Sequence, residues 1–185
     1  MNYTNQSKEP VEFYEPKLHY GEIIEEKMKG HLNTHLAKDL NCHRNTISNI
    51  YSNRDINTER LVQISLLSTL KPSLYPRHNF FIHYKEYVTE EILKRNRYSL
   101  SVEKIEDLTA IDIYAITMGE FIQQKINKIA WLALKLSRTD SAASKACQNE
   151  YFNTYRLFNI SIWVNFNLFV FYYERIEKQL NDFAT

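Results

Sequence analysis

The sequence predicts an all-α fold, and two observations lead to it. Only three glycines and four prolines interrupt a chain of 185 residues that is 44% hydrophobic, so tight turns are few and the structural elements are long. Beyond residue 100, apolar side chains recur at alternating steps of three and four. That spacing places them along one stripe of a helix. A chain of this length is sufficient for one large globular domain or two small ones.

The first element in chain order is a polar arm, residues 1–17. It contains Pro10 and Pro16, and because proline locks φ and lacks an N–H, these residues oppose a helix. Residues 18–88 follow as a bundle of short helices, each ended by a turn signal. These signals are Gly30, Asn41, Asn53 and the stretch 71–77 with its two prolines. We expect a loose arm followed by one compact domain.

Residues 89–185 are expected to contain a pair of long antiparallel helices and to serve in dimerisation or sensing. One apolar stripe runs over residues 108–136 and the next over residues 151–180, with a polar break at 138–144. Aromatic side chains are frequent in the second stripe. They are typical of a helical core or a dimer seam, and a small-molecule pocket is the alternative.

Two other interpretations of the second stripe stay open. Residues 158–170 also alternate with period two, as a strand does, and residues 157–173 carry no charge, as a membrane span would. The helical period continues to Leu180, whereas the alternation does not. A span of seventeen residues is at the short limit, and three asparagines would need hydrogen-bond partners in hydrocarbon. We therefore favour a helix and no membrane span.

The pattern that points to function lies between residues 36 and 50, where two short apolar faces flank a turn. The first face consists of Leu36, Ala37 and Leu40, and the second of Ile47 and Ile50. Asn41 stands where the chain must turn, and Asn tolerates the left-handed conformation better than any residue except Gly. Cys42 is small enough to fill the space between the two helices. This pattern predicts a helix-turn-helix over residues 32–53.

The second helix of this motif presents polar side chains outward, namely Arg44, Asn45, Ser48 and Asn49. Arg can donate two hydrogen bonds to guanine, and Asn can pair with adenine. The alternative is an ordinary solvated face. Two short helices packed at a steep angle with such a face have the geometry that enters a major groove. The motif therefore predicts binding to double-stranded DNA.

Residues 18–70 resemble the Cro/C1 or XRE-like family of repressor-type helix-turn-helix regulators. The matching stretches are Gly21-Glu22-Ile23-Ile24, Leu36-Ala37, Arg44-Asn45-Thr46-Ile47-Ser48 and Asp55 to Ser65. The resemblance implies a five-helix, lambda-repressor-like domain in which the third helix reads DNA. A narrower likeness to a Bacteroidota subset rests on the order Cys42 to Ile47, and on Phe80-Phe81 followed by His83-Tyr84.

The resemblance also implies a role for each site residue. Arg44, Asn45, Ser48 and Asn49 match the base-reading face, and Asn33 matches a phosphate contact at the start of the second helix. The remaining interface residues, near the DNA backbone or at the helix cap, are His43, Thr46, Asn53 and Arg54. The family usually has Gly where Asn41 and Asn53 stand, and Asn is the natural second choice. Asn57 or Thr58 would cap the fourth helix, with Leu61 and Ile64 facing the core.

Charge is unevenly distributed along the chain. Only the first half has an excess of positive charge, which is what a nucleic-acid partner favours. Residues 17–85 hold ten Lys and Arg against six Asp and Glu, whereas residues 86–185 hold twelve against thirteen. An excess of this size is weak evidence by itself. The polar N-terminus shows no secretory signal, and Cys42 and Cys147 are expected to stay reduced, so we expect a cytoplasmic protein.

Catalysis, metal and cofactors are not expected. His31, His35, Cys42 and His43 are close in sequence, but the motif sends Cys42 to the core and His43 to a helix cap, so they would not converge on a metal. With three glycines there is no Gly-rich phosphate loop, and no serine lies in a nucleophile elbow. We predict that the chain is not an enzyme.

The leading hypothesis is a homodimeric, sequence-specific transcriptional regulator. Trp131, Trp163 and Phe171 fall off the main stripes and leave apolar surface that a second copy could cover. An effector of residues 89–185, either a small molecule or a protein, is open. The rival is an interaction protein, antitoxin-like or phage-encoded, whose C-terminal helices bind another protein. A tetracycline-repressor type is disfavoured because residues 55–65 read as a fourth short helix.

Overall fold

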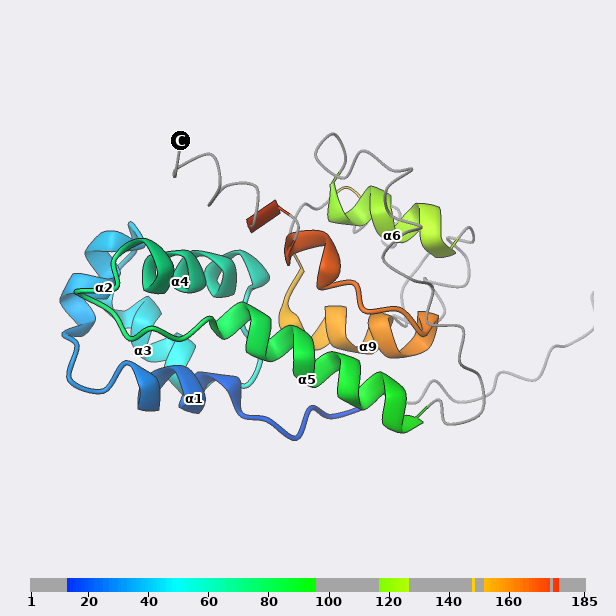
Figure 1. Ribbon diagram of the computed structural model, residues 1–185, viewed down its shortest axis with the longest axis horizontal. Coiled ribbons are helices and arrows are strands. Elements are labelled where there is room, and N and C mark those ends of the chain that lie inside the picture. The colour runs from blue at the N-terminus through cyan, green and yellow to red at the C-terminus, as the bar shows by residue number, and fades with distance from the viewer. Residues whose placement is uncertain (1–12, 96–116, 127–147, 149–151, 174, 177–185) are drawn as a thin grey trace, which may run out of the picture.

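The computed structural model describes residues 13–95, 117–126, 148, 152–173 and 175–176, and these confirm the all-α prediction. Among them, β-pairing is limited to an isolated antiparallel bridge between Asn57 and Asn153. In chain order the helices are α1 (Tyr20–Lys27), α2 (Asn33–Asp39), α3 (Arg44–Ser52), α4 (Thr58–Leu70), α5 (Phe80–Arg95), α6 (Met118–Ile126) and α9 (Thr154–Val164). Helices α1 to α4 gather at one end, α6 and α9 lie at the other, and α5 spans the two (Figure 1).

Turn residues and caps define the short helices much as the sequence suggests. Gly30 and Asn41 adopt positive φ, at 95° and 48°. The side chain of Asn57 caps α4 by accepting the Glu59 N–H at 2.8 Å. Asn53 does not take the left-handed conformation expected from the resemblance, since its φ is −104°. Its side-chain amide instead donates to the Asn49 carbonyl. A carbonyl in the last turn of α3 thus gains a hydrogen-bond partner without a left-handed turn.

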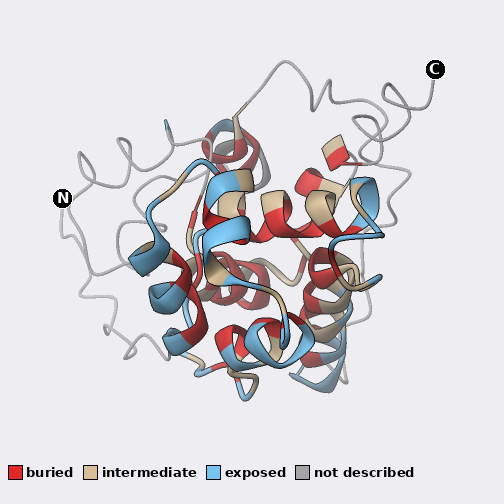
Figure 2. Cartoon of the chain, turned by 90° about the vertical axis from the view of Figure 1, so that its left-hand side faces the viewer, coloured by how far each residue is buried: buried red, intermediate tan, exposed pale blue. Residues whose placement is uncertain are grey.

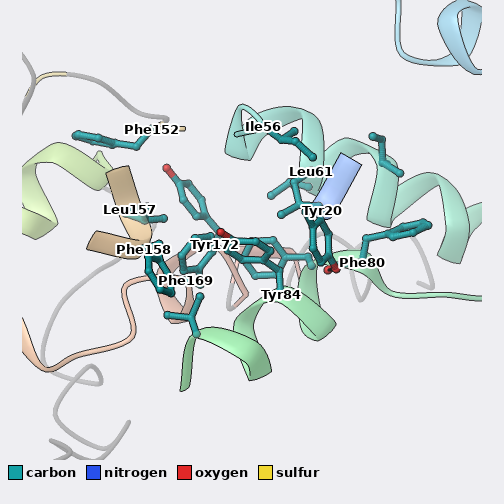
Figure 3. Close-up of a cluster of buried hydrophobic side chains, with 14 of the residues drawn as sticks. Tyr20, Ile56, Leu61, Phe80, Tyr84, Phe152, Leu157, Phe158, Phe169 and Tyr172 are labelled. Carbon is teal, nitrogen blue, oxygen red and sulfur yellow. Dashed lines mark hydrogen bonds between the residues drawn. The ribbon is translucent and has the colours of Figure 1, made fainter. Parts of the chain in front are cut away.

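The core is continuous from the N-terminal helices to α9. Figure 3 shows buried side chains from α1, α4, α5 and the α9 region facing one another. These include Tyr20, Ile56, Leu61, Phe80, Tyr84, Phe152, Leu157, Phe158, Phe169 and Tyr172. The predicted division after residue 88 falls within α5, which packs against both α4 and α9. Helix α5 therefore belongs to both halves of the molecule.

The prediction of one long helix over residues 151–180 is wrong. Helix α9 ends at Val164, and Asn165 takes the left-handed conformation with φ 53°. Polar side chains hold the turn that follows: the Ser161 hydroxyl accepts the Leu168 N–H at 3.2 Å, and the Asn167 amide donates to the Lys85 carbonyl at 2.8 Å. Residues 170–173 then form a further helical turn.

Other predictions for the second half have separate outcomes. The strand interpretation of residues 158–170 is wrong, because residues 158–164 lie in α9. Helix α6 covers residues 118–126 of the first predicted long helix. Thr117 precedes it outside the helix, with its hydroxyl accepting the Glu120 N–H at 3.2 Å, so a helix starts here within the predicted one. The other residues of that prediction lie outside the described residues. In the part of the chain that the structure describes, no helix has both the length and the apolar composition of a membrane span.

Two expectations about exposed surface also need correction. The arm was expected to be loose, but residues 13–17 are fastened to the body of the molecule, through Tyr14 to Asn159 and through Lys17 to Tyr87. Phe171 is fully buried, and the ring of Trp163 contacts Phe13 of this segment. The apolar surface proposed for a second copy is therefore covered at Phe171 and partly covered at Trp163, while Trp131 lies outside the described residues.

Candidate nucleic-acid interface

Helices α2 and α3 pack as a helix-turn-helix around the left-handed residue Asn41. Leu36 and Ile47, one from each helix, are 1% and 0% exposed. The Cys42 N–H donates to the Ala37 carbonyl at 2.9 Å, and the Cys42 side chain packs against the core. The local pattern predicted from the sequence is thus present, because a short apolar face on each helix and a residue that tolerates positive φ suffice to form it.

Helix α3 begins at Arg44 because His43 caps it. His43 is extended, and its Nδ1 accepts the Asn45 N–H at 3.2 Å. A free N–H at a helix start needs an acceptor, and a side-chain cap provides one. The imidazole is therefore held at the first turn of α3, beside the polar face that follows it.

Polar contacts from α4 and the α4–α5 connection fix the turn from outside. The guanidinium of Arg60 donates to the Leu40 carbonyl at 2.9 Å. Asp39 accepts a hydrogen bond from the Lys71 ammonium at 2.8 Å and from the Tyr75 hydroxyl at 2.6 Å. These two partners, Lys71 first, lower the pKa of Asp39 below its usual value. The end of α2 is thereby held against a second layer of the fold.

Helix α1 supports α3 from behind through a close contact at Gly21. A Cβ at this position would overlap the backbone carbonyl oxygens of Ile50, Tyr51 and Asn53. Only a glycine allows the start of α1 to approach the end of α3 so closely. With Ile47 and Ile50 buried beneath it, α3 is held on its inner side by packing and at its end by this contact.

The outer side of α3 carries the predicted reading residues, and all four are exposed. Among the described residues, none makes a hydrogen bond or ion pair with the side chains of Arg44, Asn45, Ser48 or Asn49. His43, Asn53 and Arg54 are also exposed, and Thr46 is half-buried. Figure 2 looks onto this end of the molecule, where the outward faces of the helices are exposed and the inward faces are buried. The polar face is thus available to a ligand.

Asn33 differs from the other predicted site residues in its surroundings. It lines a pocket of about 450 Å³ together with Glu22, Glu25, Glu26 and Tyr51. Burial, and then the charge of Glu25, raise the pKa of Tyr51 to about 12. The three carboxylates outnumber the one ammonium of this lining, Lys29, so this edge is the least suited part of the predicted interface to contact a DNA backbone.

Sequence reasoning missed three residues that position the motif. Gly21 was matched only as part of a family stretch, although a glycine inside a helical pattern suggests close backbone approach. Arg60 caps the turn from α4, and its role depends on a contact twenty residues away that no local pattern encodes. Asp55 accepts the Tyr155 N–H at 2.9 Å and the Thr154 hydroxyl at 3.3 Å. Burial raises the pKa of this carboxyl.

Comparison with known proteins does not identify a relative. No protein-family model, no curated protein and no solved structure matches the chain.

Proposed function

We propose that the chain is a cytoplasmic, sequence-specific DNA-binding protein that regulates transcription, with α3 in the major groove. The observation that carries this proposal is the outer face of α3. It has four exposed side chains with base-reading chemistry, and they directly follow a helix-turn-helix turn. The repressor-type resemblance of residues 18–70 supports the same function.

In this proposal Arg44 donates two hydrogen bonds to a guanine, and Asn45 and Asn49 pair with adenines. Ser48 reaches a base edge or a phosphate. His43, Thr46, Asn53 and Arg54 lie at the two ends of α3, and they contact the backbone and fix its register on the duplex. The buried inner side of α3 holds the backbone of this helix in place before DNA binds, which limits the backbone entropy lost in the complex.

A second copy of the chain is part of the proposal, because one small helix-turn-helix makes few DNA contacts and dimers reading two half-sites are the usual remedy. An effector of the C-terminal half, either a small molecule or a protein, is included as the input to regulation. Sedimentation of the full chain is expected to give a dimer. A monomer that binds a single half-site would remove the second copy from the proposal.

The deciding experiment is selection of bound sequences from random double-stranded DNA by the purified full chain. We expect a defined motif to be enriched. Arg44→Ala should cost roughly 1 to 3 kcal/mol on that motif and relax the preference at one base pair. Arg77→Ala is the matched control, since it removes an exposed arginine outside α2 and α3. It should leave the sequence preference unchanged.

Two outcomes would contradict the proposal. Equal losses for Arg44→Ala on selected and random DNA would mean that Arg44 acts only as a charge. Failure of any sequence to be enriched would favour the rival function, an interaction protein in which DNA contact is lost. In that function the C-terminal helices bind another protein.

A further inference from the structure

Residues 13–17, which we name the strap, contain no helix and lie against α5 and α9 in the manner of a bound peptide. Their hydrogen bonds connect positions far apart in sequence. The Tyr14 main chain is bonded to Asn159 on α9, and the Lys17 N–H donates to the Tyr87 hydroxyl on α5 at 2.8 Å. Because residues 13–17 contain no helix and these hydrogen bonds join them to other elements, the strap can dissociate from α5 and α9 without unfolding a helix.

The central contact is a clamp made by the amide of Asn159. Its Oδ1 accepts the Tyr14 N–H at 2.7 Å, and its Nδ2 donates to the Tyr14 carbonyl at 3.1 Å. A further hydrogen bond from Nδ2 to the Tyr155 carbonyl, at 3.0 Å, fixes the orientation of the amide. Asn159 is 0% exposed, and a buried amide is unfavourable unless it is paired. The clamp recognises main chain, so by itself it does not distinguish between side chains.

Side chains on the same surface add selectivity. The Phe13 ring makes an edge contact with Trp163, with centroids 5.2 Å apart, and stacks on Tyr155 at 6.4 Å. The Arg95 guanidinium lies 4.2 Å from the centroid of the Tyr14 ring. The surfaces that contact the Phe13 and Tyr14 rings therefore favour two adjacent aromatic residues, the second of which faces a cation.

The strap is only partly enclosed. Phe13 is 40% exposed and Glu15 and Lys17 are exposed, whereas Pro16 is buried and Tyr14 is half-buried against the core. The Tyr155 hydroxyl donates to the Glu15 carboxylate at 3.3 Å. Release of the strap uncovers the contacts of Tyr14 and Pro16 but breaks no helix, and segments of this type open at free energies below that of global unfolding.

We propose that the strap seat on α5 and α9 is a peptide-binding site, occupied here by the chain's own residues 13–17. Its ligand is an unstructured segment of a partner protein with two adjacent aromatic residues followed by an acidic residue and proline. The partner segment displaces the strap and uses the same clamp. This inference does not depend on DNA binding, and its test contains no DNA.

The test uses the full chain with the strap weakened, as the triple variant Phe13→Gly, Tyr14→Ser and Pro16→Ser. These changes remove the ring contacts and the buried proline and leave the strap only its main-chain hydrogen bonds. The probe is a labelled, acetylated peptide of residues 13–19, followed by fluorescence anisotropy. We expect saturable binding to the triple variant and roughly tenfold weaker binding to the wild-type chain, where the tethered strap competes at an effective concentration on the millimolar scale. Adding Asn159→Leu to the triple variant should abolish binding.

Two modified peptides isolate the clamp without changing the protein. Methylation of the Tyr14 nitrogen removes the hydrogen bond to Asn159 and should weaken binding roughly tenfold or more. Methylation of the Glu15 nitrogen is the matched control, because that N–H has no partner among the described residues. It should bind like the unmodified peptide. Equal affinities of the two methylated peptides would overturn the clamp.

Two further results would overturn the proposal. One is absence of saturable binding up to about 1 mM peptide, the concentration scale of a short tether, to a triple variant with unchanged circular dichroism. The other is measured on the wild-type chain by hydrogen exchange and applies even if the triple variant does not fold. If the Tyr14 amide exchanges only as slowly as the amides of α5, the strap is not released separately and no partner can replace it.

Discussion

The contact between α1 and α3 at Gly21 gives a prediction whose magnitude follows from the geometry. A Cβ added at Gly21 would overlap three carbonyl oxygens, those of Ile50, Tyr51 and Asn53. All three belong to the main chain, so no side chain can rotate away to make room. Gly21→Ala must therefore push the start of α1 away from the end of α3, or tilt α3 itself.

Two opposing effects decide the size of the change. Ala is a better helix former than Gly by about 1 kcal/mol, which stabilises α1. Forcing extra volume into a well-packed contact costs about 1 to 3 kcal/mol, and a backbone overlap with three atoms lies at the upper end of that range. We expect Gly21→Ala to lower the free energy of unfolding by about 2 kcal/mol.

The assay is urea unfolding followed by circular dichroism, combined with DNA binding of the folded variant. Gly30→Ala is the control: its Cβ would meet no atom within 4 Å, and its φ of 95° makes Ala strained. It should lose about 1 kcal/mol through backbone strain alone, without moving α3. DNA affinity is expected to fall for Gly21→Ala only. A Gly21→Ala variant as stable as the wild-type chain would mean that the start of α1 does not touch the end of α3.

Three other outcomes are expected. Arg54→Ala should weaken binding about equally on all DNA sequences. It should also lower the slope of log binding constant against log salt concentration by about one, as measured by anisotropy at several salt concentrations. A change in sequence preference would contradict a backbone contact. Ile47→Asp places a charge where exposure is 0% and should abolish helical circular dichroism, whereas Ile47→Leu should not; an unchanged spectrum would mean that the helix is out of phase. Burial, and then His83 and Lys27, lower the pKa of His78 below its ordinary 6.5, so the unfolded chain takes up this proton more readily. Stability should therefore fall as pH drops below about 6.5, and fall less in His78→Gln, when urea unfolding is compared at about pH 7 and pH 5; identical losses would refute this.

The helix-turn-helix could be predicted from the sequence because every signal for it is local. Asn41 turns the chain, and His43 caps α3 within two residues of its bonding partner. The buried positions Leu36 and Ile47 repeat at helical spacing. Each of these features depends on residue type and on near neighbours, which is the information that a single sequence contains.

The second half could not be predicted in the same way because its turn depends on distant partners. The apolar pattern continues through Asn165 without a break, and a helix over residues 151–180 fits it. Asn167, however, bonds to Lys85 and Thr89 on α5, about eighty residues away. Since hydrophobic periodicity carries no information on such polar pairs, it cannot show where a helix of this kind ends. The position of the strap was missed for the same reason.

The loop between α3 and α4 is bonded to the start of α9, and this connects the proposed reading helix to the C-terminal half. The Thr154 N–H donates to the Ile56 carbonyl at 2.8 Å, and the Thr58 N–H donates to the Phe152 carbonyl at 3.0 Å. Asp55 caps the first turn of α9 from the same loop. Because this loop begins just after α3 ends, a displacement of α9 must either move the end of α3 or break these bonds. If the chain binds DNA as proposed, a ligand of the C-terminal half would change its DNA affinity only if that ligand binds more tightly to one position of this loop than to another.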